Sequence, residues 1–458
     1  MTPEGLAATV PRATAIVTEN EIVIHVQNDS LARPALAPRE SRHAVAALVL
    51  ASVLIALISP RATPVLLLLL GGALVVPALP GRAALAAIAR HPVMLALGVL
   101  WLYLLVNATW SVDPLEAFER AGLFALIACL AAAVRVALPK IEEDGARRLH
   151  LALALAIAAG IVFLAIETPL GQPIRRLIVS LAPFLRPAPK HIVVAKGWVE
   201  QIASYTLNRN LAVLNLMLWP GFLLLRSRLT PGAARGSAAA LLVLSALAIF
   251  TSEHETSMIA LVASCVVFAG MLVAAPLLRA LVLAGWLVVT LLVVPIAAYS
   301  HQAGLHQARW LPQTARNRIV LWSVTAEKMK ESPLLGIGIA STKPLDEEAA
   351  PTAITRPGDT YPQRTGRHSH NIFMQTWYEL GAIGAVLLML TGVMGLRAIA
   401  RLPEDDQPYV YASFVSAVVL ASFTWGMWQP WFMCAFGLWV IMLLVGLDAA
   451  RRSRASPQ

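Results

Sequence analysis

Long apolar stretches that recur along the chain constrain its fold more than any other feature. Only 14% of the 458 residues are charged, whereas a soluble domain carries roughly 25%. Backbone polar groups in hydrocarbon must be satisfied within each segment, so such stretches cross a membrane as α-helices. We predict an all-α polytopic membrane protein with about twelve transmembrane helices, near residues 43–59, 64–79, 93–107, 117–138, 149–167, 211–225, 237–251, 257–275, 277–299, 372–395, 409–427 and 431–447.

The distribution of Lys and Arg predicts the orientation of these spans, because short cytoplasmic loops carry an excess of basic residues. With the N-terminus inside, the short loops outside hold only Arg61 and Arg120. The inside receives Arg33, Arg39, Arg42, Arg82, Arg90, Lys140, Arg147, Arg148, Arg226, Arg228, Arg235, Arg397, Arg401, Arg451, Arg452 and Arg454. Both termini are therefore expected in the cytoplasm. The net charge of +10 reflects this topology, and no nucleic-acid partner is expected, because the basic residues do not gather on one soluble face.

The predicted topology divides the chain into five parts. They are a cytoplasmic N-terminal tail at 1–42, spans one to nine at 43–299 with an outside segment at 168–210, a large outside loop at 300–370, spans ten to twelve at 371–447, and a cytoplasmic tail at 448–458. Loops of this length are usually functional or disordered. Amphipathic stretches at 174–185 and 198–207 and a helical pattern at 318–329 argue against disorder. We expect the chemistry in these outside segments.

Several short motifs lie in and around the outside segments. An Arg-x-x-x-Trp motif occupies 318–322, a Pro-Leu-Leu-Gly-Ile-Gly turn occupies 333–338, and a His-Asn pair at 370–371 opens the tenth span. In these motifs the chain resembles the O-antigen ligase and polymerase superfamily. The resemblance extends to Trp-Ser-Val-Asp-Pro at 110–114 and to Asn-Arg-Asn at 208–210.

The resemblance implies a fold, a reaction and its partners. It implies a GT-C-like membrane fold with a large periplasmic loop between spans nine and ten. It also implies transfer of a glycan from undecaprenyl diphosphate to an acceptor hydroxyl at the periplasmic face of the bacterial inner membrane, without nucleotide, metal or other cofactor. The expected partners are an undecaprenyl diphosphate-linked O-antigen donor, a lipid A-core acceptor and membrane lipids.

Three arginines are candidates for binding the diphosphate. Charge develops on phosphate oxygens as the lipid diphosphate leaves, and the planar fork of an arginine can meet it with two hydrogen bonds. Arg318 and Arg209 both lie where an outside segment meets a span, and Arg316 lies two residues before Arg318. The alternative for Arg318 and Arg209 is a snorkelling arginine that anchors a helix at the interface. The alternative for Arg316 is a side chain that faces water.

His370 is the candidate catalytic residue, because an imidazole that titrates near neutral pH can take a proton from an acceptor hydroxyl. Its alternative role is an interface residue or helix cap. The neighbouring Asn371 either orients His370 or caps the helix that follows. His368 is a supporting residue, and it invites a metal-site interpretation. A metal site needs further ligands, and none is spaced nearby, so we expect no metal.

Two further features have a structural alternative. Trp322 is either an interface anchor or a platform for a sugar ring. The Glu-His-Glu stretch at 253–255 could help to position a substrate, but we favour a solvated turn. The superfamily shows Ser-Arg near such a turn, and this chain departs from that pattern.

The combined interpretation is an O-antigen ligase that acts by direct displacement, with inversion at the anomeric carbon, because one candidate base is evident and no spaced carboxylate pair offers a covalent intermediate. An O-antigen polymerase would use the same donor with a second lipid-linked glycan as acceptor. A protein O-oligosaccharyltransferase is a third possibility. A lipid-linked glycan flippase is the alternative that is not an enzyme.

Overall fold

The computed structural model describes residues 13–18, 21–26, 39–76, 79 and 81–455, and the chain divides into two units. The first unit is formed by residues 1–43. Its described part contains an antiparallel pair of strands, β1 (Ala13–Thr18) and β2 (Glu21–Val26), in which Thr18 lies opposite Glu21. The predicted N-terminal tail thus contains a hairpin, and the rest of that tail up to residue 38 lies outside the described residues.

The second unit, residues 44–458, contains a helix at the position of every predicted span. These helices are α1 (Arg39–Ile58), α2 (Thr63–Val75), α4 (Pro92–Ala108), α5 (Pro114–Ala137), α6 (Glu143–Glu167), α8 (Asn208–Arg228), α9 (Pro231–Phe250), α10 (Glu255–Gln302), α13 (Ile372–Ile399), α14 (Gln407–Phe423) and α15 (Pro430–Ala455). Among the described residues, seven helices are long and apolar enough to cross a membrane. The bent pair of α3 (Arg82–Ala89) and α4 adds an eighth, and α1, α2 and α14 are shorter apolar helices. The all-α membrane fold agrees with the prediction, whereas the number of twelve spans stays a prediction.

Two predicted spans, 257–275 and 277–299, fall within the single element α10. The backbone of α10 leaves helical geometry at Ala274, with a proline just beyond it, and proline both lacks an N–H group and clashes with the preceding turn. Phe268, before the break, lies 5.0 Å from Tyr409 at the start of α14. Trp286, after the break, lies 5.7 Å from a ring farther along the same helix. Because both arms contact one short helix, α10 folds back on itself at the break.

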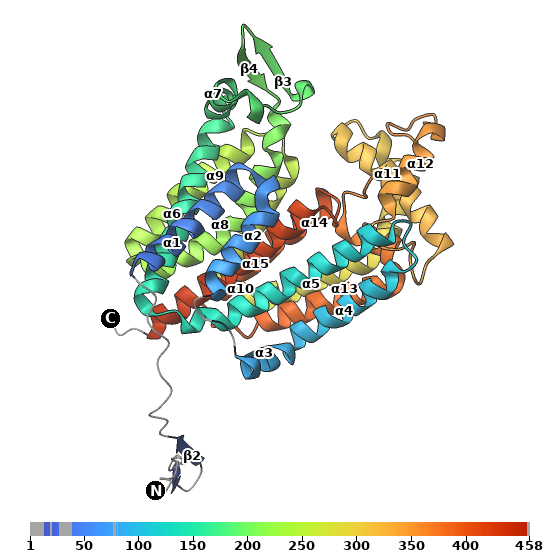
Figure 1. The fold of residues 1–458 in the computed structure, drawn as a ribbon. Helices are drawn as coiled ribbons and strands as arrows, with labels where there is room; N and C mark the ends of the chain where they lie inside the picture. The colour runs from blue at the N-terminus through green and yellow to red at the C-terminus, as the bar shows by residue number, and fades with distance from the viewer. Residues whose placement is uncertain (1–12, 19–20, 27–38, 77–78, 80, 456–458) are drawn as a thin grey trace, which may run out of the picture. The chain divides into compact units, whose positions relative to one another are not determined.

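Helix α8 lies at the centre of one half of the bundle. Every residue from 210 to 224 is buried, and the helix packs against α6, α9, α14 and α15. Helices in a membrane associate mainly through close packing, for which small residues are suited. Gly446 of α15 faces α8, where an added Cβ atom would lie 3.2 Å from the Leu223 side chain. The second half of the bundle contains α4, α5, α10 and α13 (Figure 1).

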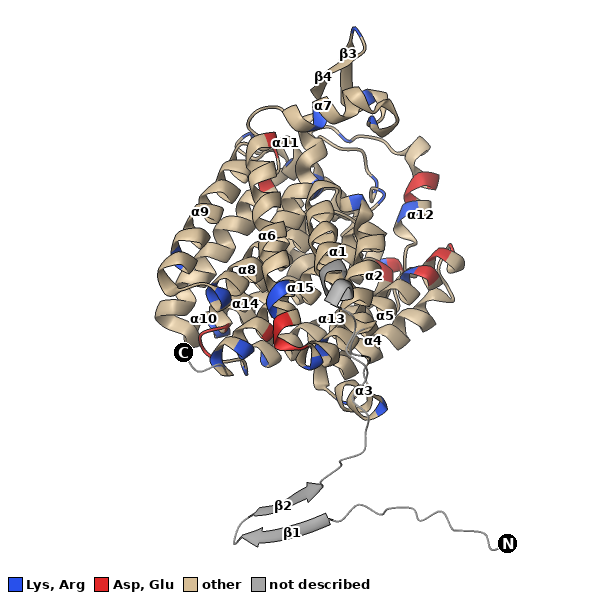
Figure 2. Ribbon diagram, turned by 60° about the vertical axis from the view of Figure 1, so that its left-hand side comes forward, with Lys and Arg blue, Asp and Glu red and all other residues tan. Residues whose placement is uncertain are grey.

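The two long segments that were predicted to lie outside, called the outer segments from here on, are both structured. Residues 168–210 form α7 (Pro173–Leu181), β3 (Ile192–Ala195) and β4 (Trp198–Ile202), and residues 300–370 form α11 (Gln313–Lys328) and α12 (Thr342–Ala349). The amphipathic stretch predicted at 174–185 is therefore largely the helix α7, whereas the stretch at 198–207 forms β4 and a short 3-10 turn. Both views of the second unit show the two segments at the same end of the helices (Figures 1 and 2).

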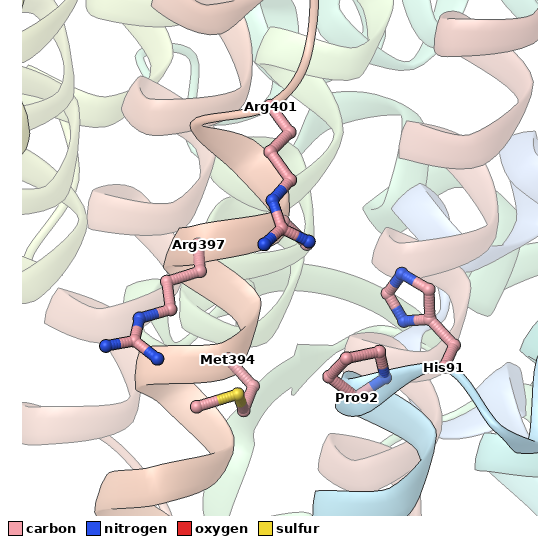
Figure 3. Close-up of a pocket in the computed structure, with 6 residues that line it drawn as sticks. His91, Pro92, Met394, Arg397 and Arg401 are labelled. Carbon is pink, nitrogen blue, oxygen red and sulfur yellow. The ribbon is translucent and has the colours of Figure 1, made fainter.

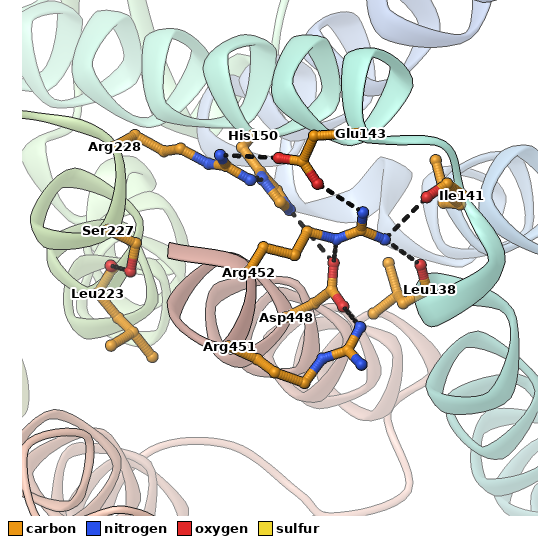
Figure 4. Close-up of polar contacts among 10 residues, drawn as sticks. All are labelled: Leu138, Ile141, Glu143, His150, Leu223, Ser227, Arg228, Asp448, Arg451 and Arg452. Atoms are coloured by element: carbon orange, nitrogen blue, oxygen red, sulfur yellow. Dashed lines mark hydrogen bonds and ion pairs between the residues drawn. The ribbon is translucent and has the colours of Figure 1, made fainter. Parts of the chain in front are cut away.

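Charged residues of this unit gather at the two ends of the helices, and long uncharged stretches separate them (Figure 2). At the end away from the outer segments, a polar network joins α5, α6, α8 and α15 (Figure 4). Arg452 donates to the Asp448 carboxylate at 2.7 Å and to the Leu138 carbonyl at 2.8 Å. The fully buried His150 accepts from Arg228. Helix α15 thus continues to Ala455, through most of the predicted cytoplasmic tail.

Candidate active site

The Pro-Leu-Leu-Gly-Ile-Gly turn packs into a break in α13. Gly381 interrupts that helix with a φ of 63°, which leaves two carbonyl groups without helical partners. The turn satisfies them, because Ile337 N donates to Tyr378 O at 3.1 Å and Gly338 N donates to Glu379 O at 3.0 Å. Gly338 also has a positive φ of 98°. An added Cβ atom there would lie 2.5 Å from the backbone of Ser111, in the connection between α4 and α5. Only glycine meets both demands at this position.

The connection between α4 and α5 holds the same turn from the other side. Asn107 donates to Leu335 O at 2.9 Å and accepts from Ile339 N at 2.7 Å. Ser111 donates to Ile339 O at 2.7 Å. The Trp-Ser-Val-Asp-Pro motif at 110–114 therefore has a structural role, which is to fix the turn that precedes the candidate catalytic loop.

His370 lies directly before α13 in a left-handed backbone conformation, with a φ of 53°. Its Nδ1 atom lies 2.5 Å from the carbonyl oxygen of Thr424, at the end of α14. A carbonyl can only accept, so Nδ1 carries the proton and Nε2 presents a lone pair. Burial and, to a smaller extent, the charge of Arg318 lower the pKa of His370 to about 4, and the hydrogen bond with the Thr424 carbonyl opposes both effects. The ring is therefore neutral at physiological pH, which differs from the expectation that it titrates near neutrality.

His368 lies beside His370, with 4.1 Å between the ring centroids. Burial lowers the pKa of His368 to about 3, and the charges of His370 and Arg367 act in the same direction. Its Cβ atom packs on Gly426, where an added Cβ would lie 2.7 Å away. His368 also lines a cleft of about 330 Å³, whose charged lining residues are Glu116, Arg120, Lys343, Arg367 and Glu379.

In addition to burial, the positive charge of Arg318 on α11 lowers the pKa of His370, His368 and His254. Burial lowers the pKa of Arg318 itself, and the nearby carboxylate of Glu255 opposes that effect. Among the described residues, no side chain forms an ion pair or a hydrogen bond with its guanidinium. Arg318 is therefore a half-buried cation with its donors available to an anion.

Trp322 and Asn371 hold the loop that carries His370. Trp322 donates from Nε1 to the carbonyl oxygen of Ser369 at 2.6 Å, one residue before the histidine. The Asn371 side chain accepts from the backbone N–H groups of Phe373 and Met374 at 2.9 and 3.0 Å. Its oxygen thus caps α13. Of the two roles considered for Asn371, the structure shows the cap.

The other two arginines stand apart from the histidines. Arg209 opens α8, and its guanidinium carbon lies 5.1 Å from the ring centroid of Trp431, a cation–π contact. Trp431 contacts Trp425 at 4.8 Å, so aromatic rings connect Arg209 with the loop that binds His370. Arg316 is half-buried, and its Nε atom has no hydrogen-bond partner among the described residues. Nothing in the described chain brings Arg316 against His370.

Sequence reasoning missed the connection between α14 and α15, residues 424–430. Thr424 binds His370, Gly426 packs on His368, and Trp428 donates to the buried carboxylate of Glu379. Glu379 is fully buried and also accepts from the Thr342 hydroxyl at 2.6 Å. The signal in the sequence was a set of three closely spaced tryptophans, Trp425, Trp428 and Trp431, which lie with Gly426 between two apolar stretches.

The expectation of a solvated turn at 253–255 is wrong for its middle residue. His254 is 8% exposed, its Nδ1 lies 2.6 Å from the Ser257 hydroxyl, and its ring lies 5.4 Å from Trp425. Burial lowers the pKa of His254 to about 4, and Arg318 contributes to the shift. Glu253 and Glu255 are exposed. His254 is therefore a neutral, buried neighbour of Arg318, because Trp425 covers it.

A smaller cavity of about 130 Å³ lies at the other end of α13 (Figure 3). His91 and Pro92 from the start of α4 face Arg397 and Arg401 from the end of α13 across it. Because His370 precedes the first residue of α13 and these arginines stand in or after its last turn, this cavity does not belong to the histidine site.

Comparisons with known proteins agree with the motifs. The family described as O-Antigen ligase matches residues 240–389, the part of the chain that carries Arg318 and His370. A protein of Rickettsia conorii named "Putative polysaccharide ligase" is 29% identical over 132 residues, which are 29% of this chain and 31% of that protein. A Rickettsia felis protein of that name is 23% identical over 270 residues, or 58% of this chain and 65% of that protein.

Each of these matches spans less than two thirds of the relative's own length. A Rickettsia bellii protein of the same name is 26% identical over 171 residues, which are 37% of this chain and 41% of that protein. The family match covers the arginine motif, the glycine turn and the histidine motif, which the structure brings together at one end of the bundle. Over residues 240–389 the chain is thus similar to the O-antigen ligase family, and its relatives named for polysaccharide ligation support a place in that superfamily.

Proposed function

We propose that the protein is an O-antigen ligase of the bacterial inner membrane. It transfers polysaccharide from undecaprenyl diphosphate to a hydroxyl of the lipid A-core oligosaccharide at the periplasmic face. The observation that carries the proposal is a buried pair of histidines, His368 and His370, whose ring centroids lie 4.1 Å apart within electrostatic reach of Arg318, a cation that has no ion-pair partner among the described residues. The relatives named for polysaccharide ligation support glycan transfer as the class of reaction.

Arg318 is the residue that binds the diphosphate of the donor. Burial strengthens its interaction with an anion, because fewer water molecules screen the charges. No ion pair within the described chain competes for its guanidinium, so an incoming diphosphate replaces no existing partner. Arg209 and Arg316 are further diphosphate-binding candidates, and the stack of Arg209 on Trp431 keeps its guanidinium at the end of α8.

His370 acts on the acceptor hydroxyl through Nε2. Its Nδ1–H group is bound to the Thr424 carbonyl, which fixes both the tautomer and the direction of the ring. The charge of Arg318 depresses the pKa of His370, and a bound diphosphate would offset that charge. Donor binding therefore raises the pKa of His370 and makes it a stronger base at the stage when the acceptor must lose its proton.

The cleft beside His368 is the place for the acceptor sugar. Its lining combines hydrogen-bonding groups with the indole of Trp428, and such a surface can both bind hydroxyl groups and stack on a sugar ring. With a diphosphate on Arg318 and a hydroxyl on His370, the hydroxyl oxygen attacks the anomeric carbon as the diphosphate leaves. One displacement inverts the configuration, without metal or cofactor.

The test is transfer of an undecaprenyl diphosphate-linked glycan to lipid A-core by the purified full chain in chelator. His370→Ala and Arg318→Ala are expected to lower the rate by about 10²–10⁴-fold, the range for losing a general base or a charge-stabilising group. The matched controls are His191→Ala and Arg309→Ala, which remove a histidine and an exposed arginine of the outer segments that play no part in the mechanism.

The products decide between the candidate functions. Lipid A-linked polysaccharide of inverted configuration is expected. Longer lipid-linked glycan without a lipid A product would identify a polymerase, glycosylated protein would identify an oligosaccharyltransferase, and movement of the donor across a vesicle without a new bond would identify a flippase. Retained configuration would contradict the direct displacement.

A further inference from the structure

Three potential metal ligands meet at the base of the large outer segment, away from the residues of the proposed reaction. They are His301 in the last turn of α10, His306 in the short 3-10 helix that follows, and Asp359 in the loop before His370. Their ligand atoms all lie within 4.8 Å of one another. Among the described residues, this is the one group of three His, Cys, Asp or Glu side chains with such spacing.

The backbone is shaped to bring these residues together. Gly304 turns the chain in a left-handed conformation with a φ of 74°, so that the rings of His301 and His306 stack with 4.1 Å between their centroids. Gly358, directly before Asp359, also has a positive φ, and a Cβ atom there would lie 2.6 Å from the Gln307 amide. Two glycine-dependent turns thus fix the meeting point.

The distances between the ligand atoms match those around a tetrahedral ion, although the contact between His301 and Asp359 is also a long hydrogen bond. The Nε2 atoms of His301 and His306 lie 3.3 and 3.4 Å from the same oxygen, Oδ1 of Asp359. Hydrogen bonds between these atom types are typically about 2.7–3.2 Å long. Tetrahedral zinc with bonds of about 2.0–2.1 Å holds its ligand atoms about 3.3–3.4 Å apart. Both histidine nitrogens therefore already lie at the spacing from Asp359 Oδ1 that two zinc ligands have, and all three ligand atoms lie within 4.8 Å of one another.

Burial and a neighbouring hydrogen bond favour metal binding by these side chains. The Asp359 side chain is 3% exposed and that of His306 is 7% exposed, and a buried carboxylate needs a cation or donors. Gln363 donates to the other carboxylate oxygen, Oδ2, which leaves Oδ1 for the ion in the manner of an outer-shell partner.

We propose that His301, His306 and Asp359 form a zinc site that ties the end of α10 to the loop leading toward His370. The Gln307 amide nitrogen lies 3.1 Å from His306 Nε2, so it competes with the ion for that atom, and a water or its rotated amide oxygen completes the tetrahedron. An ion between the stacked imidazoles tilts both rings toward it. The site is structural, so the glycan transfer proceeds without it.

Zinc binding tests the site independently of glycan transfer. The purified full chain is stripped with chelator, incubated with Zn²⁺, desalted, and measured for bound zinc by mass spectrometry and for melting temperature. Wild type is expected to retain one zinc ion and to melt at a higher temperature with it. Asp359→Asn keeps the shape but loses the anionic ligand, so its zinc affinity should fall by at least about 100-fold, more than an outer-shell change costs.

His301→Gln is the second ligand variant, because its half-exposed side chain tolerates replacement and keeps the proposal testable if Asp359→Asn does not fold. His191→Gln is the matched control, a histidine of the other outer segment that contacts Tyr205 and no carboxylate. Loss of zinc in both ligand variants, with retention in the control, supports the site. Equal zinc in wild type, both variants and control, or none in wild type, overturns it.

Discussion

The Nδ1 atom of His370 lies 2.5 Å from the carbonyl oxygen of Thr424, although the two residues are 54 positions apart in the sequence. This contact fixes the imidazole between the start of α13 and the end of α14 and leaves Nε2 with its lone pair. It also makes the α14–α15 connection part of the candidate active site, because the next two residues, Trp425 and Gly426, pack on His254 and His368.

The pH dependence of transfer should follow from the low pKa of His370. Its neutral form is the active one, and burial places its pKa at about 4 in the free protein. We expect kcat/KM to be constant from neutral pH down to about 5 and to fall below that as the imidazole gains a proton. Because bound diphosphate opposes Arg318, the acid limb of kcat should lie at a higher pH. If the acid limbs of kcat/KM and kcat coincided near pH 6.5, the pKa of His370 would not be lowered in the protein.

The rate of transfer should depend on the shape of the side chain at position 318 as well as on its charge. We expect Arg318→Gln to lower kcat by about 10²–10³-fold, as loss of a donor to a developing anion does. Arg318→Lys keeps the charge but loses the planar fork, so its loss should be smaller but still clear. The acid limb of kcat/KM should move to higher pH in Arg318→Gln, because the depressing charge is gone, and should stay in place in Arg318→Lys. An acid limb of kcat/KM at the same pH in both variants would show that the charge of Arg318 does not lower the pKa of His370.

The glycine turn predicts a stability difference between two glycine substitutions. Gly338→Ala places a side chain 2.5 Å from the Ser111 backbone at a φ of 98°, so we expect a loss of about 2 kcal/mol or more. Gly395→Ala is the control, because it lies in the regular part of α13 with no atom within 4 Å of the added Cβ. That change should leave the thermal midpoint unchanged or raise it. Similar midpoints for the two variants would argue against the packed turn.

The polar network of Figure 4 predicts unequal effects of two adjacent arginines. The Arg452 side chain is 11% exposed and donates to Asp448 and to two carbonyl groups, and it also pairs with Glu143. Its removal leaves the buried Asp448 without its best partner, so Arg452→Ala should cost about 3–5 kcal/mol. Arg451 is 55% exposed, and Arg451→Ala should cost less than about 1 kcal/mol. Thermal unfolding in detergent measures both, and equal losses would contradict the network.

The apolar runs and the charged residues between them predicted the positions of the helices. Each predicted span has a helix, and the two outer segments lie at one end of the second unit (Figures 1 and 2). The break inside α10 at Ala274 lies at the boundary between two predicted spans, and a proline in the long apolar run follows it. The continuation of α15 to Ala455 was not predicted, because Arg452 bonds there to the distant Leu138. The strand β4 was not predicted either, because its pairing with the neighbouring β3 decides it.

The sequence by itself determined the class of this protein and its helices, because hydrocarbon forces each apolar run to satisfy its own backbone. It also carried the motifs that resemble the O-antigen ligase superfamily. It also named Arg318, His370 and the glycine turn. Only the tertiary structure decided that Thr424 holds His370, that Asn371 caps α13, and that His254 is buried under Trp425. The pKa of a histidine depends on its burial and on charges from other helices, and no local pattern of residues contains that information.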